Sequence, residues 1–372
     1  MLKPQTESDL EEVIRSASGP LRITGGGTRP IGNPVTGDVL SLSAMSGIEL
    51  YEPGALTLVA KAGTPIAEVT AALKAENQRL AFEPMDHGSL LGTEGASTIG
   101  GVVAANVSGP RRIQAGACRD SLIGVRFVDG SGAAIKNGGR VMKNVTGYDL
   151  VKLMAGSYGT LGVLSEVSFK VLPGIDATAT LVFSDIDFAT TAILFSTAMG
   201  APYEVSGAAR LSQGGQVLLR LEGFTDSVQY RTTQLSDLLS KIAPSTIITD
   251  PVENEALWKR VANVDDLADT QGDVWRISVK PTDMPSVTQA LSGCTFQLDW
   301  AGGLIWALAP EGHDLRKALT GIAGHATLIR AQTGTKERLG VFHPEPAPIV
   351  ALSQGLRAKF DPRGILNPGL MG

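Results

Sequence analysis

The sequence predicts an α+β protein with more than one domain. The chain has 372 residues, and since domains usually contain roughly 150 residues, two or three are expected. Glycine is in excess, with 44 residues, most of them in the first half, and glycine permits backbone conformations that other residues avoid. Beyond residue 174 glycine becomes rarer, and strand and helix patterns alternate regularly. We therefore expect a glycine-rich first domain and a more regular second one.

The composition argues against several classes of partner. The 32 basic and 37 acidic residues give a net charge of −5, and no basic run occurs, which disfavours nucleic acid and anionic membranes as primary partners. Cys118 and Cys294 have no metal or iron–sulfur spacing, so no such site and no disulfide framework is expected. No apolar stretch approaches the roughly 20 residues that span a bilayer. We expect no transmembrane segment and a cytoplasmic location.

The first domain begins with a helix at residues 7–17, where apolar residues recur at i, i+3, i+4 and i+7. Apolar runs then predict strands at 21–23, 39–43 and 57–62. Thr64 is expected to cap a second helix that has Pro65 at its first position, because threonine and proline favour these two places.

Residues 83–116 show no clear periodicity, and a loop of this length is usually functional. Its apolar part, from Val102 onward, predicts a short helix. A hairpin with its turn at residues 129–130 follows at 122–135. A helix at 144–156 and a strand at 163–172 complete the first domain.

The second domain is predicted to contain a structural repeat. Residues 178–250 and 274–330 each read as strand–helix–strand–strand–helix–strand, with hairpins at 212–215 and 301–303. This order is that of ferredoxin-like folds. A last helix and an apolar tail are expected from residue 352 onward.

The glycine triplet at residues 25–27 follows a predicted strand, and its N–H groups could surround a phosphate. A Walker A loop is excluded because no Lys-Ser or Lys-Thr follows. A Rossmann loop is excluded as well, because Pro30 stands where a helix would begin. The alternative is a tight turn between strands that binds nothing.

Four stretches together resemble vanillyl-alcohol-oxidase-type flavoproteins, which carry a PCMH-type FAD-binding domain. They are TGGGTRPIG at 24–32, TIGGVVAAN at 98–106, GYDL at 147–150 with GSYGTLGV at 156–163, and FDPRGILNPG at 360–369. Within this group, the length, SGPRR at 108–112 and KNVTGYD at 143–149 resemble the E-subunit family of multisubunit glycolate oxidases. The stretches occur in the expected order over nearly the whole chain.

The resemblance implies an FAD-binding domain of two α/β subdomains at 1–174, divided near residue 52. It further implies a ferredoxin-like α/β cap domain at 175–335 and a C-terminal helical segment at 336–372 that returns to the first domain. The implied cofactor is noncovalent FAD. Its implied binding residues are Thr24, Gly25, Gly26, Gly27, Thr28, Asp86, Thr98, Ile99, Gly100, Gly101, Ser108 and Val163.

The physical chemistry of these residues supports the same interpretation. The three glycine N–H groups and the Thr28 hydroxyl can replace the hydration of a pyrophosphate. Gly100 and Gly101 are expected to begin a short helix whose free N–H groups offer a second polar site. The resemblance places Val163 against the adenine. For Thr98 and Ser108 the alternative role is ordinary turn capping.

The sequence departs from catalytic relatives that oxidise 2-hydroxy acids. His313, His325 and His343 each stand alone, without spacing suited to a metal, so no metal site and no catalytic residue is identified. His87, beside Asp86, is either a flavin tether or, as we favour, an exposed loop residue. Cys118 is expected to be buried filler.

Arg111 and Arg112 lie either near a phosphate or a partner's carboxylates, or on a solvated edge. Sequence alone leaves these possibilities open.

Three functions are compatible with these features. The first is an FAD-binding subunit of a multisubunit glycolate or 2-hydroxy-acid oxidoreductase, with a sister FAD subunit and an iron–sulfur subunit implied by the resemblance. That complex would be cytoplasmic or peripheral at the inner membrane. The second is a self-sufficient flavin oxidoreductase, which the missing metal cluster disfavours. The third is a structural partner without chemistry, which the glycine loops disfavour.

Overall fold

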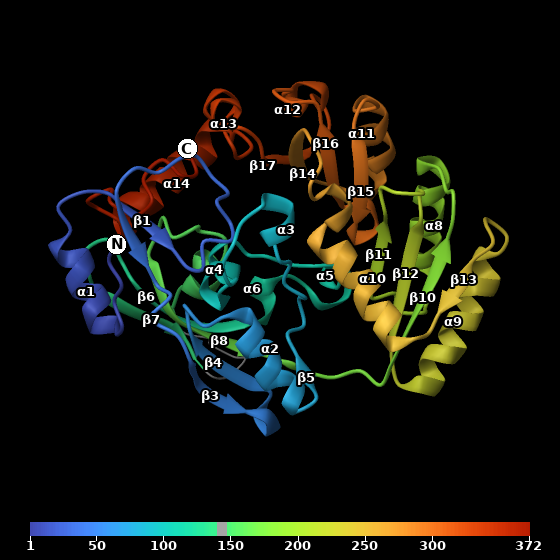
Figure 1. Ribbon diagram of the computed structural model, residues 1–372, viewed down its shortest axis with the longest axis horizontal. Coiled ribbons are helices and arrows are strands. Elements are labelled where there is room, and N and C mark those ends of the chain that lie inside the picture. Colours follow the sequence, from blue (N-terminus) through green and yellow to red (C-terminus); the bar gives the residue numbers. More distant parts are fainter. Residues whose placement is uncertain (140–146) are drawn as a thin grey trace.

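The computed structural model describes residues 1–139 and 147–372, and it shows two sheet-containing units side by side (Figure 1). The first half of the chain forms a small parallel strand pair and a five-stranded antiparallel sheet. The second half forms one eight-stranded antiparallel sheet. The α+β prediction is confirmed.

The parallel pair is β1 (Leu21–Thr24) with β2 (Asp38–Ser41), and a second short pair is β5 (Gln78–Arg79) with β9 (Leu172–Pro173). The five-stranded sheet has the order β3 (Ile48–Glu52), β4 (Thr57–Lys61), β8 (Val163–Lys170), β6 (Leu122–Val128), β7 (Ala134–Gly138). Its helices are α1 (Glu7–Ser16), α2 (Ile66–Ala75), α3 (Gly88–Leu91), α4 (Ile99–Ala104), α5 (Arg112–Ala115), α6 (Cys118–Ser121) and α7 (Leu150–Met154), with a 3₁₀ turn η1 (Pro53–Ala55).

Helix α1 begins as its sequence predicts, with a reciprocal cap between Thr6 and Asp9 that satisfies N–H groups at the helix start. The predicted cap of α2 is wrong. Pro65, not Thr64, precedes the first helical residue, and no side chain caps this helix. The Thr64 hydroxyl instead forms hydrogen bonds with the backbone of Gly47 and Lys61. It therefore links the residue before β3 to the end of β4.

The predicted helix at 144–156 is only partly tested, because residues 144–146 lie outside the described part of the chain. Within that part, α7 covers Leu150–Met154 and is capped by Asp149. The long segment 83–116 is more ordered than its sequence indicates, since it contains α3, α4 and α5. Its apolar helix begins at Ile99, earlier than predicted.

The second half follows the predicted strand and helix order twice. The first repeat is β10 (Ala177–Phe183), α8 (Phe188–Gly200), β11 (Gly207–Arg210), β12 (Val217–Gly223), α9 (Thr225–Leu239) and β13 (Thr246–Ile248). The second is β14 (Asp273–Val279), α11 (Met284–Ala290), β15 (Thr295–Asp299), β16 (Leu304–Ala309), α12 (Leu315–Ala318) and β17 (Gly324–Arg330), with 3₁₀ turns η3 (Pro281–Asp283) and η4 (Trp300–Gly302). Helix α10 (Pro251–Asn263) and turn η2 (Asp265–Leu267), which the sequence analysis did not predict, connect the two repeats.

The two repeats share one sheet because β11 pairs with β15, giving the order β13-β10-β12-β11-β15-β16-β14-β17. Successive residues of a strand face opposite sides. Trp275 therefore packs into the core beneath α8, α9 and α11, whereas its neighbour Val274 and also Trp306 belong to a core shared with the first half of the chain. One face of the sheet is thus covered by α8, α9 and α11, and the other carries α10 and faces the glycine-rich unit (Figure 1).

The end of the chain returns to the first unit through α13 (Thr333–Leu339) and α14 (Ala347–Phe360) (Figure 1). Leu366 forms an isolated bridge with Leu21 of β1. The Asn367 side chain accepts a hydrogen bond from the Ile23 N–H and donates one to the Tyr158 carbonyl. The division into 1–174, 175–335 and 336–372 remains our proposal for the domain boundaries.

A buried ionic cluster joins the two units. Glu83 of the first unit receives two hydrogen bonds from Arg220 of β12, at 2.9 and 2.8 Å, and one from the Arg111 N–H. Arg111 also pairs with Glu222, and both side chains are about 95% buried. Burial would raise the pKa of Glu83, but Arg220 and Arg111 hold it below its ordinary value. Arg111 therefore lies neither beside a phosphate or a partner's carboxylates nor on a solvated edge. It is buried, and its partners are Glu83 and Glu222 of this chain.

We expect Arg220→Ala to destabilise the protein by about 3 to 5 kcal/mol, because Glu83 loses the two hydrogen bonds from that guanidinium and the cluster loses one of its cations. As a control, Lys61→Gln removes an exposed pair with Glu49 and should cost at most about 1 kcal/mol. Urea unfolding of both variants measures the difference. Equal losses would show that the buried cluster does not hold the units together.

Candidate cofactor site

A cavity of about 450 Å³ lies where the glycine loop, α4, the start of β8 and the C-terminal segment meet. The loop contributes a continuous run of lining residues, 22–35. Gly100, Tyr158 and Val163 line it from other parts of the first unit, and Lys336 from α13. Four segments far apart in the sequence therefore form one site.

The glycine loop packs tightly on residues 95–98. A Cβ atom on Gly26 would lie 1.6 Å from the Ala96 carbonyl oxygen, and one on Gly25 would lie 2.3 Å from the Thr98 hydroxyl. Gly27 differs, since it has a φ of +74° and no atom within 4 Å of a Cβ position. A side chain on Gly26 would therefore collide with the backbone of Ala96.

The loop keeps its N–H groups free for a ligand. Among the described residues, the N–H groups of Gly25, Gly26, Gly27 and Thr28 donate to no acceptor. Gly25 and Gly26 are half-buried and Gly27 is exposed, so their N–H groups are open to a ligand in the cavity, and an array of such donors suits an anion. This favours a phosphate-binding loop over a plain turn.

The N-terminus of α4 is not a second anion site. The Ile99 N–H donates to the Thr64 carbonyl and the Gly100 N–H to the Ala62 carbonyl, at 2.9 and 2.8 Å. The Gly101 N–H donates to the Thr98 side chain. The prediction of free N–H groups at Gly100 and Gly101 is therefore wrong, since the Gly100 N–H fixes α4 to the chain after β4 and the Gly101 N–H is capped by Thr98.

The charges around the cavity suit a polyanion. Arg22, Arg29 and Lys336 line it, and none of the lining residues is an acid. Burial lowers the pKa of Lys336 from its ordinary value, and Lys336 has no ion pair within the described residues. Arg29 and Lys336 are cavity residues that were not predicted. Arg29 lies inside the motif without a distinguishing signal, and Lys336 lies far from the loop in sequence. A pyrophosphate between these groups would be stabilised by both charge and N–H donors.

Nine of the twelve predicted cofactor residues line this cavity, and three do not. Ile99 is fully buried in the core, Ser108 accepts a hydrogen bond from the Cys118 N–H, and Asp86 is exposed with its carboxylate bonded to the Gly88 N–H. The alternative turn-capping role describes Ser108. Thr98 both caps α4 and lines the cavity.

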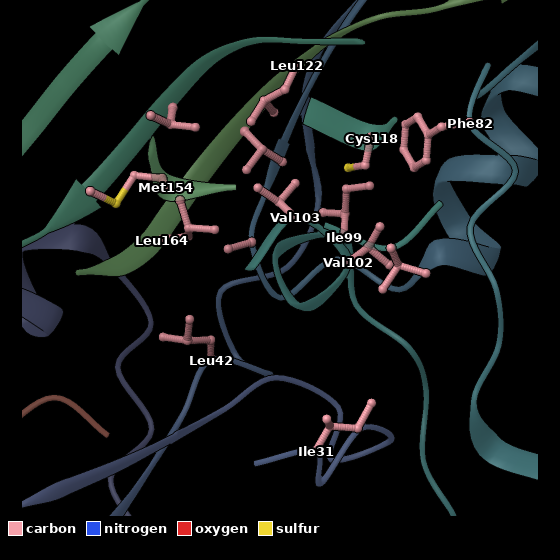
Figure 2. Close-up of a cluster of buried hydrophobic side chains, with 14 of the residues drawn as sticks. Ile31, Leu42, Phe82, Ile99, Val102, Val103, Cys118, Leu122, Met154 and Leu164 are labelled. Carbon is pink, nitrogen blue, oxygen red and sulfur yellow. The ribbon is translucent and has the colours of Figure 1, made fainter. Parts of the chain in front are cut away.

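Neither candidate for a covalent flavin link lines the cavity. Cys118 is fully buried beside Phe82 and Ile99 (Figure 2), as predicted, and burial raises the pKa of its thiol. His87 is buried and not exposed, contrary to our prediction, with an exposed fraction of 5%. Burial, aided by Arg29 and Arg276, lowers the pKa of His87 to about 3.

The late histidines are not all isolated, contrary to the sequence interpretation. The rings of His325 and His343 meet edge to face, with centroids 5.6 Å apart. Residues 1–139 and 147–372 contain no group of three or more His, Cys, Asp or Glu side chains placed to hold a metal. They also contain no helix long and apolar enough to cross a bilayer.

Comparison with known proteins identifies the cofactor. Residues 1–138 match the family model of the FAD binding domain, so this chain is an FAD-binding protein. It is 34% identical to the glycolate oxidase subunit GlcE of Escherichia coli K12, over 97% of this chain and 96% of that protein. It is 30% identical to the glycolate oxidase subunit GlcD of Bacillus subtilis, over 52% of this chain and 41% of GlcD.

Solved structures share the fold over nearly the whole chain. An alkyldihydroxyacetonephosphate synthase matches with a TM-score of 0.70 and 17% identity, over 98% of this chain and 76% of that one. A p-cresol methylhydroxylase matches with a TM-score of 0.70 and 14% identity, over 100% of this chain and 88% of that one. At these identities the likeness concerns the fold alone.

We expect Gly27→Ala to weaken FAD binding. At a positive φ the substitution costs about 1 to 2 kcal/mol in the apoprotein, and it also disturbs the N–H array. Gly92→Ala is a matched control, because Gly92 has a φ of +61° and nothing within 4 Å of its Cβ position, yet does not line the cavity.

Unfolding with and without FAD distinguishes the two variants. FAD at 100 times its dissociation constant should stabilise the wild type and Gly92→Ala by about 2.7 kcal/mol, and Gly27→Ala by much less at the same concentration. An undiminished increment in Gly27→Ala would mean that the loop holds no phosphate.

We expect the FAD to be noncovalent, because no cysteine or histidine lines the cavity. Acid precipitation should release all the yellow colour into the supernatant, and the absorbance at flavin wavelengths measures it. Colour that stays with the pellet would contradict this expectation.

Proposed function

The chain belongs to the family of the glycolate oxidase subunit GlcE, and from that membership we propose that it is the FAD-binding subunit of a multisubunit glycolate or 2-hydroxy-acid oxidoreductase. The observation that carries the proposal is the relationship to GlcE along almost the entire length of both chains. When bound, FAD would supply a two-electron acceptor for the oxidation of an alcohol. The chain's own residues hold this cofactor.

Each group that lines the cavity has a distinct proposed role. The N–H groups of Gly25 to Thr28 and the side chains of Arg22 and Arg29 would bind the pyrophosphate. Lys336 would contribute a positive charge from the opposite segment of the chain. Val163, at the start of β8, would contact the adenine. All of these residues line the cavity, which supports the proposed roles.

We further propose that the partners are a sister FAD subunit and an iron–sulfur subunit, with the complex in the cytoplasm or peripheral at the inner membrane. The relationship to GlcD supports the sister flavin subunit. The iron–sulfur subunit is implied by the resemblance of the chain to the E-subunit family. Co-purification of the tagged chain from its host tests both partners.

Two alternatives are less well supported. A self-sufficient oxidoreductase needs a general base at the reacting alcohol, and the cavity lining contains no carboxylate and no histidine. A purely structural subunit would leave the free N–H groups and the acid-free cationic cavity without a purpose.

We expect the isolated chain with bound FAD to oxidise glycolate slowly, with a turnover at least about a hundredfold below that of the complex, because a missing general base costs roughly that factor. Reduction of an artificial electron acceptor measures both. Comparable turnover by the single chain would refute the subunit proposal in favour of the self-sufficient enzyme.

A further inference from the structure

Arg316 of α12, in the second unit, donates hydrogen bonds to a row of backbone carbonyls where α13 ends. The acceptors are the carbonyl oxygens of four successive residues, 339–342, at 2.8 to 3.2 Å. The guanidinium also donates to the Ala326 carbonyl of β17 at 3.0 Å, and it packs over the Trp275 ring at 4.7 Å. Only the rigid, planar fork of an arginine offers enough donors for such a set of acceptors.

Helix α13 is short, and apolar packing does not hold it in place. It has seven residues, all of them described, and none is fully buried, whereas isolated helices of this length are unstable in water. The last carbonyl groups of a helix have no partner inside it, and a cation beside them also interacts favourably with the helix dipole. Arg316 supplies donors and charge at this end. We therefore expect the position of α13 to depend on Arg316.

Helix α13 in turn carries a residue of the cofactor cavity. The Gly340 N–H donates to the Lys336 carbonyl at 2.8 Å and so closes the last turn of the helix. Lys336 lines the cavity. The carbonyl of the same Gly340 accepts a hydrogen bond from Arg316. A single residue thus connects the guanidinium of the second unit to the backbone of Lys336.

Two further contacts join residues 339–342 to the cavity wall. The Val341 N–H donates to the Asn33 side-chain oxygen at 3.3 Å. The Phe342 ring meets the Tyr158 ring edge to face, with centroids 5.1 Å apart. Asn33 and Tyr158 both line the cavity, whereas Arg316 does not. Any effect of Arg316 on a ligand in the cavity must therefore pass through the segment that it holds.

We propose that Arg316 is a positioning residue of the cofactor site. By holding residues 339–342 it places Lys336 at the cavity wall, so that the second unit controls how tightly the chain binds FAD. The effect is conformational, and no covalent bond changes. The inference rests on the proposed function, because it takes the cavity to hold FAD and Lys336 to contribute a positive charge to it.

Titration of the apoprotein with FAD, followed by the change in flavin fluorescence, measures the dissociation constant. Arg316→Gln should raise it about tenfold, the lower end of the range for a lost hydrogen bond to a charged group. Arg316→Lys keeps the charge at the helix end but loses the fork, so its dissociation constant should fall between those of the wild type and Arg316→Gln. An unchanged dissociation constant in Arg316→Gln would overturn the inference.

Arg210→Gln is the matched control. Arg210, on β11 of the second unit, also packs over an aromatic ring, that of Phe188 at 4.2 Å, and also donates to a backbone carbonyl, that of Ile186. It does not line the cavity. Arg210→Gln should destabilise the apoprotein in urea, as Arg316→Gln does, but change the FAD dissociation constant less than about twofold. Equal weakening by the two variants would mean that general loosening of the second unit explains both.

A double-mutant cycle tests the route through Lys336, because a merely structural role would produce no coupling between the two residues. In the Lys336→Gln background, Arg316→Gln should weaken FAD binding by less than about threefold, since the side chain that it positions is already lost. The same factor of about ten in both backgrounds would show that the two residues act independently, and the inference would then be wrong.

FAD binding by the wild type separates this inference from the proposed function. A wild-type chain that binds no FAD contradicts the proposed function itself. A chain that binds FAD equally well with and without Arg316 contradicts the positioning role alone.

Discussion

The pairing of Glu83 with Arg220 and of Arg111 with Glu222 sets how the two units of this protein face each other. Glu83 lies next to Phe82, whose carbonyl receives the Gly109 N–H, and the Gly109 carbonyl in turn accepts the Trp300 indole N–H at 3.0 Å. The ionic cluster and this hydrogen bond therefore hold the eight-stranded sheet against the first unit.

The cavity itself depends on a packing constraint. Gly25 and Gly26 allow the loop to lie directly on residues 96–98, where any Cβ atom would collide. The side of the loop that faces residues 96–98 makes these packing contacts. The N–H groups of residues 25–28 have no acceptor in the described residues and are therefore available to a ligand in the cavity. The α4 N–H groups are consumed instead by the backbone of residues 62–64. The N–H groups of one glycine-rich motif thus remain open to the cavity, whereas those of the other are used in packing, although both look alike in sequence.

Much of the architecture could be predicted because its signals are local. The two strand–helix repeats after residue 174 and the glycine loop follow from patterns within about ten residues of each other. The predictions that were wrong concern contacts between residues that lie far apart in the sequence. Thr64 was misassigned because its partners are in the backbone of Gly47 and Lys61, and the burial of His87 depends on the second unit. Lys336 could not be placed at the cavity from sequence, since its position depends on the return of the chain after β17.

The hydrogen bond between Asn367 and Ile23, in β1 before the glycine loop, has a consequence for biosynthesis. Ile23 and Asn367 are separated by 344 residues, and Asn367 and Leu370 line the cavity together with the loop. While the ribosome is still making the second unit, β1 lacks its bridge to Leu366 and the cavity lacks one wall. Stable flavin loading must therefore follow, and cannot accompany, synthesis of the eight-stranded sheet. A nascent chain arrested before residue 360 would emerge folded in part but colourless.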